Sequence, residues 1–147
     1  MSESQPFRYY PRVRYGECDA QKVVFNARYG EYVDLACAEY FRALGFGAEM
    51  VSGELDFQLV KQTTEWKAPL RYDDVAEISV RTLKLGNTSF TLGFEIRFAG
   101  RPEITSTCET VYVLVDHKLG KRTIPDNVRA KFQQGAVGEV ADHAGYL

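Results

Sequence analysis

The sequence predicts an α+β domain in which a curled antiparallel sheet wraps around one long helix. Three observations support this fold class. An amphipathic segment follows Asn26, alternating apolar residues begin at Phe57, and tight-turn signals divide that alternating region into strands. A helix of about 18 residues is about 27 Å long, so it can span a small domain. A curled sheet is then the element that can bury its apolar side.

The long helix is expected to run from Asn26 to Gly45. Asn26 suits the N-cap because its side-chain oxygen can accept a hydrogen bond from a backbone N–H of the first turn. Gly45 is expected to end the helix as a left-handed residue, with Phe46 packing back on Phe41. The apolar residues between these ends recur at helical spacing and form one stripe, namely Tyr29, Val33, Ala36, Cys37, Tyr40, Phe41 and Leu44.

The remaining segments are interpreted mainly as strands. A first strand is expected at 7–15, weakened by Pro11. Strand 75–85 changes parity near Leu83, which indicates a bulge, and Gly86-Asn87 predicts a tight hairpin. One face of strand 88–99 is expected to be buried, and it carries Phe90, Leu92, Phe94, Ile96 and Phe98. The other expected elements are a helical turn within 46–56, strands at 57–68, 103–116 and 122–124, and a helix at 127–134.

Length and composition indicate an ordinary globular protein. The 147 residues are expected to form one domain, 1–147, with an ordered core at about 7–134 and a mobile tail of small and polar residues after it. Hydrophobic residues make up 45% and charged residues 26% of the chain. The aromatic content of 13% suggests a bulky core or a large subunit interface.

The same totals disfavour several classes of protein. A net charge of −2 gives no reason to expect a nucleic-acid partner. No apolar run is long enough for a membrane span, and the polar, acidic N-terminus does not resemble a signal peptide. The cysteines, Cys18, Cys37 and Cys108, are odd in number and lack metal-binding spacing. Reduced thiols in the cytoplasm are therefore expected.

Asp19 is the candidate catalytic residue. It lies seven residues before Asn26, and the run Val23-Val24-Phe25 between them is expected to anchor the loop in the core. The loop would then fold back and bring Asp19 to the N-terminus of the helix, where free backbone N–H groups can stabilise developing negative charge. The alternative is that the Asp19 carboxylate only accepts hydrogen bonds within its own turn.

These residues belong to a longer pattern: Arg14-Tyr15-Gly16-Glu17-Cys18-Asp19-Ala20, then Val23-Val24-Phe25-Asn26 and Tyr29. The pattern resembles the signature of the hotdog-fold acyl-CoA thioesterases of the 4-hydroxybenzoyl-CoA thioesterase type. In that family, aromatic-x-(Asp/Glu)-x-Asp-x-x-Gly-(Val/Ile)-Val-aromatic precedes a helix. The resemblance continues to about residue 132 through Pro69, Tyr72-Asp73-Asp74, Asn87-Thr88-Ser89-Phe90 and Val115-Asp116. Lys22 replaces the family glycine, and a positive φ at this position would be unfavourable for lysine.

The resemblance implies the hotdog fold and hydrolysis of an acyl or aroyl thioester to free acid and CoA, without a metal or cofactor. Asp19 would attack the thioester carbonyl or activate a water molecule for the attack. The backbone N–H of Asn26 would polarise the carbonyl. Phe25 and Tyr29 would bind substrate, although core packing is an equal alternative for Tyr29. Family members form dimers edge to edge with the pocket between subunits, and dimers pair into tetramers, so a homo-oligomer is expected.

The sequence leaves one other function open. A non-catalytic module of the same fold, which binds acyl-CoA or an acyl carrier, is the main alternative, and Lys22 in place of glycine favours it. The absence of Gly-x-Ser-x-Gly argues against an α/β-hydrolase thioesterase. His117 and His143 are the only histidines and lie late in the chain, which disfavours a Ser-His-Asp triad or a metal site. The nucleotide end of CoA would meet basic side chains, with candidates Arg71, Lys84, Lys121 and Arg122.

Overall fold

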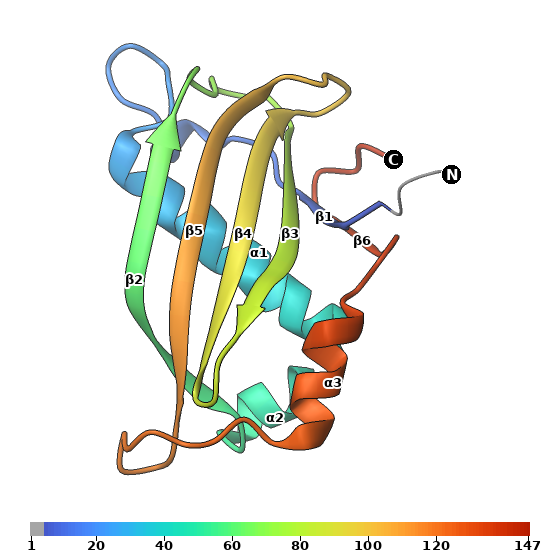
Figure 1. Ribbon diagram of the computed structural model, residues 1–147. Coiled ribbons are helices and arrows are strands. Elements are labelled where there is room, and N and C mark those ends of the chain that lie inside the picture. The colour runs from blue at the N-terminus through green and yellow to red at the C-terminus, as the bar shows by residue number, and fades with distance from the viewer. Residues whose placement is uncertain (1–4) are drawn as a thin grey trace.

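The computed structural model describes residues 5–147 (Figure 1). The strands are β1 (Phe7–Tyr10), β2 (Asp56–Trp66), β3 (Ala76–Leu85), β4 (Ser89–Phe98), β5 (Ile104–Val115) and β6 (Val140–Asp142). The α-helices are α1 (Tyr29–Ala43), α2 (Gly47–Ser52) and α3 (Asp126–Gln134), and the 3₁₀ turns are η1 (Tyr15–Glu17) and η2 (Asn26–Arg28). None of these helices is long and apolar enough to cross a membrane.

The strands form one six-stranded sheet in the order β2-β5-β4-β3-β1-β6. The sheet curves around α1, while α2 and α3 lie together at the end of the molecule where α1 finishes (Figure 1). The expected α+β fold with a curled sheet around a central helix is therefore confirmed. Only β3, β4 and β5 follow one another as a meander, because β2 pairs with β5 and β1 pairs with β3.

The C-terminal segment differs from the expected mobile tail. Its strand β6 runs parallel to β1, so the sheet is mixed and not wholly antiparallel. Backbone hydrogen bonds fix the segment on both sides of the strand, from Arg8 N–H to the Glu139 oxygen at 3.2 Å and from His143 N–H to the Tyr10 oxygen at 3.1 Å. The ring of Tyr146 stacks on Tyr10 with centroids 5.3 Å apart. The residues of this strand are small and polar, so its sequence does not predict a strand. The strand is ordered by pairing with β1, which lies far away in the chain.

The apolar stripe of α1 is buried as expected, and Tyr32 is buried with it. At the far end of the helix, the Phe41 ring contacts those of Phe57, Phe90 and Phe132 at centroid distances of 4.8 to 5.8 Å. Gly45 has a φ of 95°, and the N–H of Phe46 donates to the Phe41 oxygen at 2.9 Å, which confirms the expected helix end. The core of the domain is therefore the space between α1 and the inner face of the sheet.

Two further sequence predictions concern the strands. The pairing of β3 with β4 shifts register between Thr82 and Lys84, which is the bulge expected near Leu83. Phe90, Leu92, Phe94 and Ile96 are buried along β4, whereas Phe98, expected on the same face, is only half-buried where the strand ends. On the outer face, a Cβ on Gly93 would approach Leu83 Cδ1 to 2.8 Å, so the bulged Leu83 occupies the space that a side chain at position 93 would need.

Candidate functional site

The loop that carries Asp19 is a tight β-hairpin. Cys18 pairs with Val24, the N–H of Asp19 donates to the Val23 oxygen at 2.9 Å, and the N–H of Lys22 donates to the Asp19 oxygen at 2.9 Å. Lys22 completes the turn with a φ of 63°. This is a short hairpin loop followed by a left-handed bulge residue, a position usually filled by glycine. Lys22 therefore adopts the left-handed conformation although it is unfavourable for lysine.

The Asp19 side chain is exposed at the end of this hairpin. Its Oδ1 accepts a hydrogen bond from the N–H of Gln21 at 2.8 Å, which is the turn-stabilising contact of the alternative interpretation. Among residues 5–147, the other carboxylate oxygen has no hydrogen-bond partner. Oδ1 thus stabilises the turn. This hydrogen bond leaves the other oxygen of the exposed Asp19 side chain available for chemistry.

The residues that lead into the helix differ in part from expectation. Only Val24 of the run Val23-Val24-Phe25 is buried, whereas Phe25 is 52% exposed, because side chains alternate in the hairpin. The expected N-cap role of the Asn26 side chain is wrong. Phe25 holds the N-cap position without a side-chain hydrogen bond, and Asn26 opens η2.

The backbone N–H of Asn26 is nevertheless compatible with the role expected from the sequence, which is to donate a hydrogen bond to the substrate carbonyl. The N–H of Phe25 is occupied, since it donates to the Glu17 oxygen at 3.0 Å. The next N–H, that of Asn26, has no acceptor among residues 5–147, as is usual for the first turn of a helix. The structure therefore brings Asp19, Phe25 and the Asn26 N–H onto one exposed hairpin-to-helix junction.

A buried carboxylate, Glu17, ties this junction to α1. Glu17 is 6% exposed, and its Oε1 accepts hydrogen bonds from the Tyr32 hydroxyl at 2.6 Å and the Arg14 N–H at 2.7 Å. Its Oε2 accepts from Arg14 Nη2 at 2.9 Å. Burial by itself raises the pKa of Glu17, but these hydrogen bonds outweigh it and hold the pKa below its usual value. Glu17 is therefore an anion that fixes the hairpin in place.

Tyr29 is placed differently from the other site candidates. It is buried, its hydroxyl accepts a hydrogen bond from the Leu70 N–H at 3.3 Å, and its ring meets that of Trp66 edge to face at 6.0 Å. Burial raises the pKa of its hydroxyl. Tyr29 thus packs in the core and supports the segment after β2, and it does not face the exposed junction.

A hollow of about 450 Å³ adjoins Asp19. It is lined by Tyr15, Cys18, Asp19, Ala20, Lys22 and Tyr72. The rings of Tyr15 and Tyr72 meet edge to face at 5.8 Å, and both are exposed. A hollow of this size can hold part of a small-molecule substrate next to the carboxylate.

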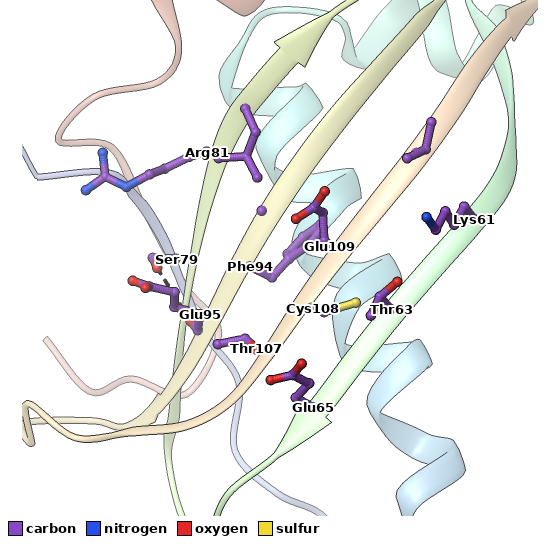
Figure 2. A pocket seen from close by; sticks show the side chains of 13 residues that line it. Lys61, Thr63, Glu65, Ser79, Arg81, Phe94, Glu95, Thr107, Cys108 and Glu109 are labelled. Atoms are coloured by element: carbon purple, nitrogen blue, oxygen red, sulfur yellow. Dashed lines mark hydrogen bonds between the residues drawn. The ribbon is translucent and has the colours of Figure 1, made fainter.

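A second hollow, of about 400 Å³, lies on the outer face of the sheet across β2, β5, β4 and β3 (Figure 2). Figure 2 shows Lys61 and Arg81 toward one end of this surface and Glu65 and Glu95 toward the other. Asp19 does not line it. Within residues 5–147, no group of three or more His, Cys, Asp or Glu residues is arranged to hold a metal ion. The hairpin junction therefore remains the strongest candidate site.

Two parts of the site were missed from the sequence. Glu17 appeared only as an acidic position of the family pattern, although an acid two residues before Asp19 and a tyrosine one turn into the helix were both visible. Tyr15 and Tyr72 are 57 positions apart in the sequence, so nothing in it places their rings together.

The sequence is similar to known thioesterases. The family model described as "Thioesterase-like superfamily" matches residues 13–132. Acyl-CoA thioester hydrolase YbgC of Escherichia coli O6:H1 is 32% identical over 130 residues, which cover 87% of this chain and 96% of YbgC.

Solved structures show the same fold. A gentisyl-coenzyme A thioesterase superposes with a TM-score of 0.77 at 29% identity, over 85% of this chain and 98% of that one. A thioesterase from Thermus thermophilus, solved with coenzyme A and zinc, superposes with a TM-score of 0.77 over 90% of this chain and 96% of that one. The identity to this second structure is 22%, so it supports the fold alone.

Proposed function

This chain belongs to the thioesterase-like superfamily and is a thioester hydrolase of the hotdog fold, and from this premise we propose that it hydrolyses acyl or aroyl thioesters of CoA at the Asp19 junction. The observation that carries the proposal is the placement of an exposed carboxylate on the hairpin that leads directly into the Asn26 N–H. The same proposal assigns the chain to the 4-hydroxybenzoyl-CoA thioesterase type within the superfamily.

In the proposed reaction, the thioester carbonyl lies against the first turn of the helix. The Asn26 N–H donates to the carbonyl oxygen and stabilises the negative charge that develops there. Asp19 either attacks the carbonyl carbon or takes a proton from the attacking water. CoA leaves as its thiol and the acyl group leaves as an acid. Phe25, which is exposed next to Asn26, contacts the acyl group. Tyr29 packs in the core beneath the junction and supports it.

We further propose that two subunits complete the site. Strand β2 is an edge strand of 11 residues, and its residues are exposed or half-buried on both faces. A long exposed edge with apolar side chains is normally covered in a native protein. Here the edge presents Leu59, Val60 and Trp66, each between 45% and 58% exposed. Pairing of two β2 edges would cover them, and tetramers would form from such dimers.

The alternative function is an acyl-CoA binding module without turnover. Lys22 at the left-handed position favoured that alternative in the sequence. In the structure, Lys22 adopts the backbone conformation that glycine would have. The hairpin path is therefore retained, which favours the enzyme over the binding module.

The test is hydrolysis of a panel of acyl-CoA substrates, followed by thiol release, with the wild type beside Asp19→Asn. The substitution keeps the shape of the side chain but removes the carboxylate. We expect a loss of about a hundredfold or more in kcat. Asp116→Asn is the matched control, because Asp116 also accepts turn N–H groups, from Lys118 at 2.8 Å and Gly120 at 3.0 Å. Equal activity of Asp19→Asn and wild type would remove Asp19 from the mechanism, and CoA binding without any turnover would favour the binding module.

A further inference from the structure

We propose that the coenzyme A arm of the substrate lies across the segment 71–75, with its pantetheine part in the Tyr15–Tyr72 hollow and its phosphates between Arg71 and Arg101. The inference rests on the proposed function, because the reacting end of the arm must be at Asp19. It assigns a binding role to two hollows and to the C-terminal segment.

The first step concerns the Tyr15–Tyr72 hollow, which begins at Asp19 itself. Tyr15 is 77% and Tyr72 is 51% exposed, so two large rings face solvent beside the carboxylate. The N–H of Tyr72 donates to the Lys22 oxygen at 3.2 Å, and this bond attaches the second ring to the hairpin. Tyrosine presents an apolar ring and a polar hydroxyl. Such a surface suits pantetheine, which alternates methylene groups with amides.

The second step concerns a hollow of about 360 Å³ that is lined by other residues of the same segment. Arg71 and Arg101 line it together with Phe98 and Tyr146. Among residues 5–147, neither guanidinium forms a salt bridge. The Arg101 guanidinium lies 5.4 Å from the centroid of the Phe98 ring. One carboxylate, Asp74, also lines this hollow, and its Oδ2 accepts the Arg71 backbone N–H at 2.8 Å.

Two unpaired guanidinium groups at one hollow fit a phosphate-bearing ligand, because arginine binds phosphate through paired charge-assisted hydrogen bonds. The two hollows adjoin the same short segment, since Tyr72 lines the first and the preceding residue, Arg71, lines the second. Arg71 also pairs with Val23 of the Asp19 hairpin. An arm that leaves Asp19 across Tyr72 therefore reaches Arg71 next.

The other basic candidates lie at the opposite end of the molecule. Arg122 Nη1 donates to the Glu54 oxygen beyond α2 at 2.8 Å, and Lys121 pairs with Val115 at the end of β5. Lys84 pairs with Thr91 beside the β3–β4 turn. In Figure 1, α2, the β3–β4 turn and the end of β5 lie at the end away from the start of α1. These three residues are therefore poorly placed for an arm that begins at Asp19.

The C-terminal segment completes the phosphate hollow. Tyr146 stacks on Tyr10, and a Cβ on Gly100 would lie 2.7 Å from the Tyr146 hydroxyl oxygen. The β4–β5 turn and the C-terminal segment therefore pack closely beside Arg101. This contact gives the segment after β6 a place at the substrate arm.

The experiment compares one acyl group carried by CoA with the same acyl group carried by pantetheine, which lacks the nucleotide. Arg101→Gln should raise KM about tenfold for the acyl-CoA and leave KM for the acyl-pantetheine unchanged, with kcat unaltered for both. Tyr72→Ala should raise KM for both substrates. Lys121→Gln is the control and should change neither value.

A second measurement is independent of turnover: calorimetric titration of each protein with CoA and with pantetheine. We expect Arg101→Gln to weaken CoA binding about tenfold and to spare pantetheine. Equal values for wild type and Arg101→Gln in both assays would overturn the arm site even if Asp19→Asn is inactive. If the wild type hydrolyses nothing but Arg101→Gln still weakens CoA binding, the proposed reaction fails while the arm site stands. If the wild type neither hydrolyses nor binds CoA, both fail.

Discussion

Lys22 shows how one residue can adopt a conformation against its own preference. Its φ of 63° lies in the left-handed region, which costs a residue with a Cβ roughly 1–2 kcal/mol. The hairpin imposes this conformation because the chain after Lys22 must turn back so that the Val23 oxygen can accept the Asp19 N–H. The turn that holds Asp19 is therefore formed at a local cost in stability.

Replacing Lys22 by glycine should stabilise the protein. Glycine relieves the left-handed strain but loses more chain entropy on folding, so we expect a net gain of at most about 1 kcal/mol in the free energy of unfolding. Urea denaturation measures it. Lys22→Ala is the control, since alanine removes the charge but keeps the strain. If Lys22→Gly and Lys22→Ala have the same free energy of unfolding, relief of backbone strain at position 22 does not explain any gain in stability.

At the scale of elements, the Asp19 hairpin and α1 are held together by a few polar contacts. Glu17 accepts the Tyr32 hydroxyl hydrogen bond from the helix and the Arg14 guanidinium from its own segment. The hairpin adds one buried apolar anchor, Val24, whose N–H donates to the Leu70 oxygen at 2.8 Å. Since the carboxylate is buried, replacing it by a neutral amide removes the charge from its hydrogen bonds to Tyr32 and Arg14 and turns one acceptor into a donor.

Glu17→Gln should lower the free energy of unfolding by about 1–3 kcal/mol at pH 7. Because the native pKa of Glu17 lies below its usual value of 4.5, the ionised carboxylate contributes stability above that pH and loses it as the pH falls through the native pKa. The difference between wild type and variant should therefore shrink in acid, as urea denaturation at pH 7, 5 and 3.5 can measure.

Glu31→Gln provides the matched control for this pH dependence. Glu31 also pairs with an arginine three residues earlier, Arg28, at 2.8 Å, but this pair is exposed. Its loss should cost less than about 1 kcal/mol at pH 7. A difference between wild type and Glu17→Gln that stays constant from pH 7 to pH 3.5 would argue against the ionised carboxylate as the source of the stability.

At the scale of the whole molecule, the two edges of the sheet differ. The β6 edge ends in a strand of three residues, whereas the β2 edge is 11 residues long and exposed. The long edge also ends at Trp66, next to the buried Tyr29 and near the start of α1. A partner on β2 would therefore lie close to the proposed site.

Val60→Lys should disrupt that contact. Val60 sits at the bulge of β2 and is 58% exposed, so a lysine is tolerated in the single chain but places like charges together in an edge-to-edge dimer. Sedimentation should show a shift toward the monomer, with a parallel loss of thioesterase activity. Val51→Lys, a change at a 91% exposed position on α2, should alter neither. A wild-type monomer, or an unchanged assembly in Val60→Lys, would contradict the proposed edge contact.

How well each part could be predicted depends on how far apart in the sequence its contacting residues are. Strand β4 and helix α1 were predicted well because their periodic apolar residues record which side is buried. The start of the helix was predicted less well, because Asn26 has a good capping side chain while the hairpin contact at Phe25 takes the N-cap position. The location in the cytoplasm and the tetramer stay predictions.

The sequence by itself determined the fold class, the long central helix with its buried stripe, the loop that carries Asp19 before that helix and the membership in a thioesterase family. Those features depend on local periodicity, turn residues and a contiguous motif. Only the tertiary structure decided that β6 joins β1, that Glu17 is buried under Tyr32, and that Tyr15 and Tyr72 share a hollow beside Asp19. Each of these brings together residues distant in the chain, and such contacts leave no periodic signal in the sequence because they depend on how the whole sheet closes around the helix.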